Sequence, residues 1–193
     1  MSDLRNHPNK TKVFDGYGSR RLFVGLWPDA HTVEALSIWA ARAHTLCGGR
    51  IMRPDTLHLT LAFLGRVEAQ RVAALCDAIP TWSICTGTLE LGRFGRFKGP
   101  RIIWAGPSDR RVGWLDALHD GLWGRLGAMG FAPPGEVFRP HVSLLRNAGL
   151  GDVSRLTVEQ PIVWTPTRCV LVASTPAEAG SYYEVLGECG VYE

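Results

Sequence analysis

The sequence predicts a mixed α/β (α+β) fold made of two similar lobes, and three observations lead to this prediction. Short apolar runs with strand character alternate with segments whose apolar residues recur at helical spacing. The order strand, helix, strand occurs twice, with similar sequences at corresponding places. A chain of 193 residues with 46% hydrophobic residues can also bury a core without disulfides or metal ions.

The first half of the chain predicts two strand–helix pairs. The apolar run 21–27 is typical of a buried strand. Asp29 after Pro28 is a signal for the start of a helix, and Gly48 with Gly49 is a signal for its end. The next elements are strands at 50–53 and 57–64 and a helix at 68–79.

The second half repeats this order and adds further strands. Strands are expected at 83–92 and 101–105, and apolar residues every four positions from Trp114 predict a helix that ends near Gly130. The last strands are expected at 137–145, 161–164, 167–174 and 182–188. The polar residues 1–19 predict a flexible tail, which leaves one bilobal domain over 20–193.

An internal repeat links the two halves. The segment 21–29 (RLFVGLWPD) is similar to 101–109 (RIIWAGPSD), and each leads into a helix that ends at glycine. Each helix is followed by a strand with the pattern His-x-Thr/Ser-Leu, at His58 and at His141. Two similar halves predict a pseudo-two-fold pair of lobes whose equivalent strands face one another across a groove.

The repeated strands each place an imidazole and a hydroxyl on one face. Because side chains alternate between the faces of a strand, His58 shares a face with Thr60, and His141 shares one with Ser143. Such a site suits phosphoester chemistry, since one neutral imidazole can take a proton while a charged one gives a proton to a leaving oxygen. The hydroxyls can donate hydrogen bonds to non-bridging oxygens. This chemistry needs no metal or cofactor.

Most histidines in proteins have no catalytic role, and four of the six here are interpreted in that way. These are His7, His31, His44 and His119. For His58 and His141 the same interpretation would have to explain a four-residue pattern that recurs in a repeated context. The repeat therefore favours a functional pair.

The charge, hydropathy and cysteine content of the sequence argue against a protein that binds long nucleic acid, spans a membrane or is secreted. The excess of three positive charges lies within residues 1–21, so the remainder is formally neutral and is unlike a surface that grips long nucleic acid. No apolar run is long enough to span a membrane, and no secretory signal precedes the first strand. Five cysteines without a C-x-x-C pair predict free thiols in a reducing compartment. We expect a cytoplasmic monomer that does not bind membranes.

The two motifs, HLTL at 58–61 and HVSL at 141–144, resemble the paired signature of the 2H phosphoesterase superfamily. The segments RLFV at 21–24, LHLTLAFLG at 57–65 and FRPHVSLLR at 138–146 resemble the bacterial and archaeal RNA 2',3'-cyclic phosphodiesterases, historically called 2'-5' RNA ligases. The resemblance runs from about residue 20 to 188. It implies two antiparallel sheets with outer helices around a central groove. It also implies metal-independent opening of a 2',3'-cyclic phosphate to a 2'-phosphate.

The resemblance also implies roles for individual residues. His58 corresponds to the proton donor and His141 to the proton acceptor, while the residues alone leave the two interchangeable. Thr60, Ser143 and Arg146 correspond to substrate-binding positions. Strict alternation places Arg146 on the face opposite His141, and only a bulge or the end of the strand turns it toward the groove. Serine at 143 replaces the commoner threonine and keeps the hydroxyl.

Several alternatives stay open at this point. The basic and aromatic segment Gly92–Arg101 suits a single-stranded nucleotide, and it equally suits a solvated hairpin loop that Phe94 anchors. Phe138 supports a base or packs in the core. The same motifs serve an esterase for another cyclic nucleotide or an ADP-ribose cyclic phosphate, and reversal of the reaction would join 2'-5' RNA ends. An RNA-end-binding module without turnover would not need both imidazoles.

Overall fold

The computed structural model describes residues 18–177 and 180–192. In this part of the chain ten strands form a sheet in the order β4-β10-β9-β1-β3-β7-β6-β5-β8, with β2 paired to β7. The strands are β1 (Ser19–Leu26), β2 (Arg50–Ile51), β3 (Leu59–Glu68), β4 (Ser83–Cys85), β5 (Leu89–Phe97), β6 (Ile102–Pro107), β7 (Val142–Arg146), β8 (Ile162–Trp164), β9 (Cys169–Thr175) and β10 (Tyr182–Tyr192). The helices are α1 (Ala30–Cys47), α2 (Ala69–Ala78) and α3 (Gly113–Ala128).

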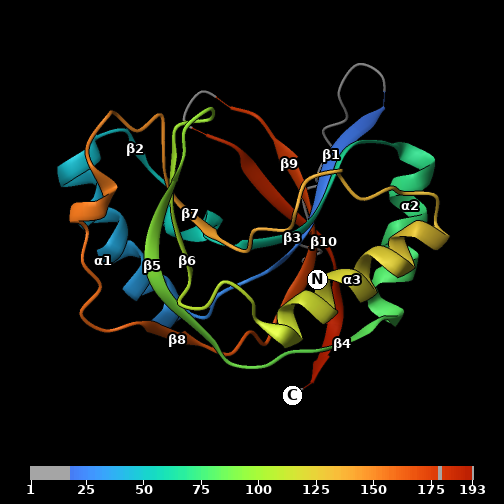
Figure 1. Cartoon of the computed structure of the whole chain (residues 1–193). Coiled ribbons are helices and arrows are strands. Elements are labelled where there is room, and N and C mark those ends of the chain that lie inside the picture. The colour runs from blue at the N-terminus through green and yellow to red at the C-terminus, as the bar shows by residue number, and fades with distance from the viewer. Residues whose placement is uncertain (1–17, 178–179, 193) are drawn as a thin grey trace, which may run out of the picture.

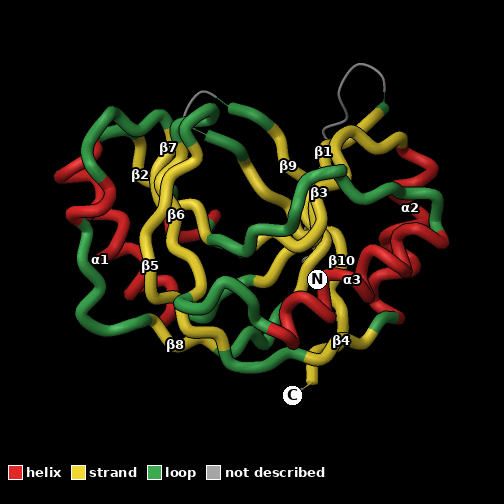
Figure 2. The backbone as a smooth tube through the Cα atoms, in the orientation of Figure 1, coloured by secondary structure: helices red, strands yellow, loops and turns green. Residues whose placement is uncertain are grey.

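The sheet is divided into two lobes where β3 meets β7. In the described structure these strands pair only at Leu59 and Val142. We call β4, β10, β9, β1 and β3 the first lobe, and β7, β6, β5, β8 and β2 the second lobe. Figure 1 shows α2 and α3 outside the first lobe and α1 outside the second, and Figure 2 shows the strands of both lobes between these helices. The predicted two-lobed α/β fold is confirmed.

The helices are exchanged between the two halves of the sequence. Helix α1 follows β1 of the first lobe, but it packs on β7 and β8 of the second. Helix α3 follows β6 of the second lobe, but it packs on β3 and β4 of the first. Each lobe is therefore completed by a helix from the other half of the repeat.

The main hydrophobic core lies between the sheet and these helices. Its fully buried side chains include Leu22 of β1, Leu36 of α1 and Trp164 of β8. A second, smaller cluster lies on the opposite face of the first lobe and consists of Phe23, Val170 and Val172, with Trp27 and Tyr183 packed against it. This second cluster covers the sheet face on which His58 lies.

The predicted ends of the first helix are confirmed. The side chain of Asp29 accepts a hydrogen bond from the Thr32 amide at 2.8 Å, which caps the first turn of α1. Gly48 ends the helix with a φ of 57°, a conformation that glycine adopts without steric cost. Strand β1 begins at Ser19, inside the segment predicted as a tail, and residues 1–17 of that tail lie outside the described residues.

Three predicted boundaries are wrong for physical reasons. The strand expected at 57–64 begins only at Leu59, because a 3-10 turn at Pro54–Thr56 precedes it. The strand expected at 137–145 begins only at Val142, because Pro140 has no amide hydrogen to donate to a neighbouring strand. The strand expected at 83–92 is two strands in different lobes, β4 and β5, since β4 pairs with β10 while β5 pairs with β6 and β8. All pairs are antiparallel except β4 with β10, which is parallel.

The remaining features of the fold concern membrane-spanning helices and cysteines. Within the described residues, no helix is long and apolar enough to cross a membrane. All five cysteines are free thiols, and three of them are buried.

Candidate active site

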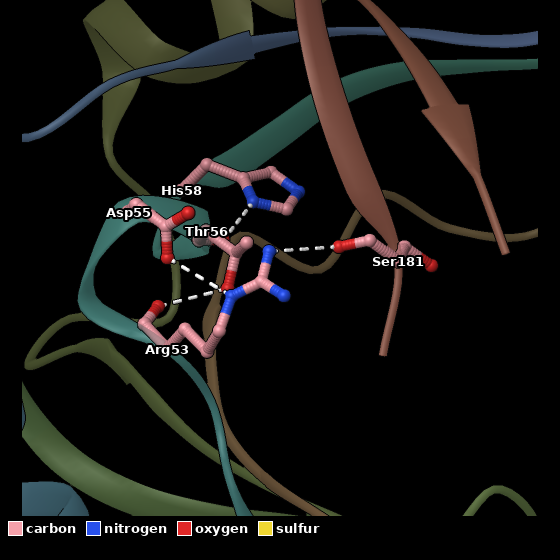
Figure 3. A network of polar contacts seen from close by, with 5 residues as sticks. All are labelled: Arg53, Asp55, Thr56, His58 and Ser181. Carbon is pink, nitrogen blue, oxygen red and sulfur yellow. Dashed lines mark hydrogen bonds and ion pairs between the residues drawn. The ribbon is translucent and has the colours of Figure 1, made fainter. Parts of the chain in front are cut away.

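His58 and His141 occupy equivalent positions in the two lobes. His58 comes immediately before the first residue of β3, and His141 comes immediately before the first residue of β7. Nδ1 of His58 lies 2.7 Å from the carbonyl oxygen of Thr56, and Nδ1 of His141 lies 2.7 Å from that of Arg139. A carbonyl oxygen can only accept, so each Nδ1 carries the hydrogen and donates it. Each Nε2 is then left for proton exchange with a substrate. Figure 3 shows this contact for His58.

Aromatic side chains hold both imidazoles in place. The ring of His58 stacks on Phe23 at 4.6 Å and on Trp27 at 5.4 Å between centroids, and Tyr183 meets it edge-on at 5.4 Å. The ring of His141 meets Phe97 edge-on at 4.8 Å, and Trp104 lies 6.2 Å away. These contacts restrict ring rotation, so the orientation of each Nε2 is set before a substrate arrives. Apart from Phe97, which lies in the segment Gly92–Arg101, the sequence did not single out these aromatic residues, because they lie on different strands far apart in the chain.

The surroundings of the histidines lower the pKa of both imidazoles. Burial is the main cause for His58 and lowers its pKa from 6.5 to about 4, against the raising effect of the Thr56 carbonyl. The charges of His141 and Arg146 lower the pKa of His58 further. Burial is also the main reason that the pKa of His141 is lowered. Both imidazoles are therefore neutral at pH 7 in the free protein.

The lowered pKa of His58 predicts an acid-sensitive fold. Since the native state keeps this imidazole neutral while the unfolded chain binds its proton below pH 6.5, stability is complete above pH 6.5 and is lost as the pH falls toward 4. The expected loss is roughly 3 kcal/mol from this group. Urea unfolding of the wild type and of His58→Gln between pH 7 and pH 4 measures it, with the exposed His31→Gln as control. Equal pH slopes for the wild type and His58→Gln would contradict the prediction.

The two predicted hydroxyl residues lie at matching places on the strands. Thr60 and Ser143 are both half-buried, two residues beyond their histidines. Thr60 is paired with Gly25 of β1, and Ser143 is paired with Trp104 of β6. Glycine is needed at position 25, since a Cβ atom there would lie 2.9 Å from the Leu59 carbonyl oxygen and 3.5 Å from the His58 ring.

A β-bulge in β7 changes the face on which Arg146 lies. Ser143 pairs with Trp104 and Leu145 with the adjacent Ile103, so Leu144 is an extra residue between them. Leu144 and Leu145 are consequently both fully buried, and Arg146 is exposed. Arg146 lines a pocket together with Thr56 and Tyr183, both of which contact His58, so it lies on the face of the sheet that carries the histidines. Strict alternation is therefore wrong at this position.

Arg146 lines a pocket of about 160 Å³ between the lobes, together with two arginines that sequence reasoning missed. We call it the arginine pocket; its lining includes Arg50, Arg53, Thr56, Arg146 and Tyr183. In Figure 3, Arg53 donates to the carbonyl oxygen of Ser181 at 3.1 Å and contacts Asp55 at 3.1 Å. Arg50 lies in the two-residue strand β2, and Arg53 comes just before the 3-10 turn at Pro54–Thr56. Such short elements have no periodic pattern from which the direction of a side chain can be predicted.

The segment Gly92–Arg101 belongs to the hairpin of β5 and β6, and Phe94 anchors it in the core as one interpretation expected, although most of the segment is strand and not solvated loop. It is strand β5 as far as Phe97, and only its end forms a turn. Arg96 donates to the carbonyl oxygens of Gly149 and Gly151, and Phe94 packs on Trp39 at 4.6 Å, so both have structural roles. Phe97 is the residue of the segment that contacts His141.

Phe138 and His119 pack against one another, which is the structural role that the sequence analysis considered for each of them. Phe138 stacks on the ring of His119 at 4.0 Å, which supports packing and not base binding. His119 also contacts Asp120 at 3.1 Å. Across the part of the chain that the structure describes, no group of three or more His, Cys, Asp or Glu side chains is placed to hold a metal ion.

Comparisons with known proteins agree on one family. The family model described as LigT like Phosphoesterase matches residues 26–104. The RNA 2',3'-cyclic phosphodiesterase of Escherichia coli strain K12 is 32% identical over 129 residues, which cover 67% of this chain and 73% of that protein. The protein of the same name from Thermotoga maritima is 30% identical over 153 residues, covering 74% and 79%. The crystal structure of E. coli LigT complexed with 3'-AMP has a TM-score of 0.76 and 28% identity, covering 91% of this chain and 99% of that one.

Proposed function

Because this chain belongs to the LigT-like phosphoesterase family, we propose that it hydrolyses the 2',3'-cyclic phosphate of RNA ends or nucleotides to a 2'-phosphate. The observation that carries the proposal is the pair of half-buried imidazoles, each with Nδ1 bonded to a carbonyl oxygen, beside a pocket lined by three arginines. The names of the relatives supply the substrate class. A binding module without turnover would not need two imidazoles held in this way.

The two histidines divide the proton transfers. Nε2 of His141 takes a proton from water, and the water oxygen forms a bond to phosphorus. The bond from phosphorus to the 3'-oxygen breaks, and Nε2 of His58 gives its proton to that oxygen. The products are a 2'-phosphate and a 3'-hydroxyl, and both histidines return to their starting states by exchange with solvent. This assignment of donor and acceptor follows the family resemblance.

The negative charge of the substrate stabilises the protonated form of His58 that the mechanism needs, and the proton itself comes from solvent. The free protein keeps His58 neutral at pH 7, since burial lowers its pKa to about 4. A phosphate diester is an anion, and an anion beside a buried imidazole favours its charged form. Substrate binding therefore raises the pKa of His58 and prepares it to act as an acid.

The remaining predicted site residues bind the phosphate. Thr60 and Ser143 donate hydrogen bonds to non-bridging oxygens from opposite strands. Arg146 meets the phosphate with its planar guanidinium, which can bond to two oxygens at once. The same groups serve 2'-5' joining when the 5'-hydroxyl of a second RNA end takes the place of water. Its oxygen then bonds to phosphorus while the bond to the 3'-oxygen breaks, His141 takes the hydroxyl proton and His58 gives a proton to the 3'-oxygen.

The proposed reaction is expected to continue in excess chelator, because imidazoles, hydroxyls and arginine supply all the proton transfer and charge stabilisation. The assay offers 2',3'-cyclic nucleotides, a short RNA ending in a 2',3'-cyclic phosphate, ADP-ribose 1'',2''-cyclic phosphate and a 2'-5'-linked dinucleotide. Product identification is expected to give a 2'-phosphate from the first two substrates. Loss of activity in chelator with recovery on adding a divalent ion would overturn the metal-free mechanism, and turnover of the ADP-ribose compound alone would overturn the substrate class.

We further propose that the protein works as a monomer in the cytoplasm. The five free cysteines, three of them buried, support a reducing compartment. The proposed reaction uses residues of one chain alone, so it does not require a second copy. Sedimentation of the purified protein at assay concentration tests the oligomeric state.

A further inference from the structure

Arg93 of β5 lies on the sheet face of the second lobe that carries His141. The next residue, Phe94, packs on helix α1 in the core, so Arg93 points to the opposite face of the strand. Its guanidinium lies over the ring of Trp104, with the central carbon 5.6 Å from the centroid. The centroid of the same ring lies 6.2 Å from that of His141. Trp104 therefore connects this arginine to one of the two histidines.

Arg93 and His141 stand in one row across the sheet, two strands apart. Arg93 pairs with Gly106 of β6, and the residue before Gly106 pairs with Val142, the residue after His141. Because neighbouring strands lie about 4.8 Å apart, the Cα atoms of the arginine and the histidine are roughly 10 Å apart. A Cβ atom at Gly106 would lie 2.6 Å from the Trp104 ring, so glycine leaves room for the ring that lies near both residues.

The half-buried guanidinium of Arg93 has no acceptor in the described part of the chain. Its Nε atom is buried without a hydrogen-bond partner, and none of the ion pairs among the described residues includes it. Arg96, on the opposite face of the same strand, instead donates to two carbonyl oxygens. A partly buried cation without an acceptor costs free energy, and an anion at its terminal nitrogens offsets that cost.

The proposed acid and base decide which part of a substrate lies on this side. The bond to the 3'-oxygen breaks beside His58 of the first lobe, and the attacking oxygen enters opposite it, beside His141 of the second lobe. The ribose that keeps the 3'-oxygen therefore lies toward the first lobe. Whatever is attached to the attacking oxygen lies toward the second lobe, where Arg93 is. Water carries nothing there, whereas the 5'-hydroxyl of an RNA strand belongs to a nucleotide with a phosphodiester on its 3' side.

Resting on the proposed function, we propose that Arg93 forms an acceptor subsite for 2'-5' joining. It binds the first phosphodiester of the RNA strand whose 5'-hydroxyl attacks the cyclic phosphate. Trp104 packs against the guanidinium and sets its position relative to His141. A planar guanidinium can bond to two oxygens of that phosphate and so hold the hydroxyl beside the base. The subsite selects RNA strands over nucleosides as acceptors and has no part in hydrolysis.

The test measures joining and hydrolysis with the same donor, an RNA tetranucleotide that ends in a 2',3'-cyclic phosphate. The acceptor is an RNA trinucleotide with a 5'-hydroxyl. Arg93→Gln keeps much of the side chain and removes the charge, and it is expected to raise the acceptor KM by about 5-fold to 50-fold through loss of a charge-assisted contact. We expect kcat/KM for hydrolysis of the donor to change less than about twofold. Arg93→Lys keeps the charge without the planar fork and is expected to recover part of the acceptor binding.

Two results would overturn the acceptor subsite. One is an acceptor KM that Arg93→Gln leaves unchanged. The other is a loss in donor hydrolysis as large as the loss in joining, because this would place Arg93 on the donor strand or in the support of the fold. Circular dichroism of each variant shows whether it is folded.

A matched control comes from the other face of the same strand. Arg96→Gln removes an arginine that bonds to the carbonyl oxygens of Gly149 and Gly151. It is expected to leave the ratio of joined to hydrolysed product unchanged. A change in that ratio as large as that of Arg93→Gln would mean that a disturbed β5, and not the lost guanidinium, causes the effect.

Binding without turnover separates this inference from the proposed reaction. Fluorescence anisotropy measures Kd for the trinucleotide with a label at its 3' end, in an excess of a nucleoside 2'-phosphate that keeps it out of the catalytic phosphate site. Arg93→Gln is expected to raise Kd by a factor similar to its effect on KM and to reduce the dependence of log Kd on log salt by about 0.7. If the wild type neither hydrolyses nor joins, the proposed function fails, and this measurement still decides the subsite. An unchanged Kd with an unchanged salt dependence would reject it.

Discussion

Replacing either His58 or His141 by alanine lowers kcat by on the order of 10²–10⁴, the usual range for one positioned acid or base. Neither imidazole can do both transfers, because one must be neutral and the other charged within the same complex. His58→Ala also leaves a gap among Phe23, Trp27 and Tyr183, so His58→Gln is the companion variant that keeps most of the volume. Steady-state kinetics with a 2',3'-cyclic nucleotide, together with circular dichroism of each variant, measures the loss in folded protein.

The pH profile of the wild type is the second part of this expectation. In the active form of the free protein one imidazole is protonated and the other is neutral. This requirement gives a bell-shaped dependence of kcat/KM on pH. Since the pKa of each imidazole is lowered, the maximum of kcat/KM lies below pH 6.5. The curve for kcat reports the bound complex and lies at higher pH, because the anionic substrate raises the pKa of the histidines.

A partly buried histidine away from the groove provides the control. His119→Ala removes a ring that stacks on Phe138, and it is expected to leave kcat within about twofold of the wild type. The paired mechanism would be disproved by near-full activity in His58→Gln or in His141→Ala, or by a kcat/KM that rises continuously through pH 8.

Replacing Arg146 by alanine lowers kcat well beyond tenfold. The cyclic diester carries one negative charge and the transition state carries more, so a guanidinium beside it stabilises the transition state more than the bound substrate. Such a loss appears in kcat more than in KM. Arg146→Lys recovers only part of the activity, because an ammonium group cannot bond to two phosphate oxygens in a plane. Kinetics of the three proteins on one cyclic nucleotide measures the effect.

The matched control for this prediction is Arg42, an exposed arginine of α1 that donates to the carbonyl oxygen of Thr157. Arg42→Ala is expected to keep kcat and KM within about twofold of the wild type. If Arg146→Ala behaves in the same way, Arg146 has no part in the reaction, whatever its place in the arginine pocket.

The features that the sequence predicts well are those with a local cause. The repeat, the capping of α1 by Asp29 and Gly48, and the shared face of each histidine and hydroxyl all depend on neighbouring residues. Arg146 shows where this reasoning ends, because an extra residue in β7 reverses the alternation. The adjacent Leu144 and Leu145 are the local sign of that bulge, since two consecutive apolar residues disrupt a strict in-and-out pattern. Only the family resemblance implied that Arg146 belongs to the substrate site, and that role stays a prediction.

Features that depend on distant pairing are not visible in the sequence. The split of the strand expected at 83–92 follows from partners in two different lobes. The aromatic residues around the histidines come from four strands and the residues just after one of them, so no spacing connects them. Arg50 and Arg53 reach the arginine pocket from a two-residue strand and the turn beyond it. In each case the position is decided by which strands meet, and not by the local pattern.

The exchange of helices between the two halves has a consequence for synthesis on the ribosome. Leu36, Trp39, Ala40 and Ala43 of α1 are buried in the finished protein, where α1 packs on β7 and β8. Those strands leave the ribosome roughly a hundred residues after the helix, several seconds later at ordinary rates of translation. Through that interval the nascent chain carries an apolar helix face without its partner, which is a surface that chaperones recognise. The late strands β7 and β8 are therefore needed before even the first helix can reach its native position.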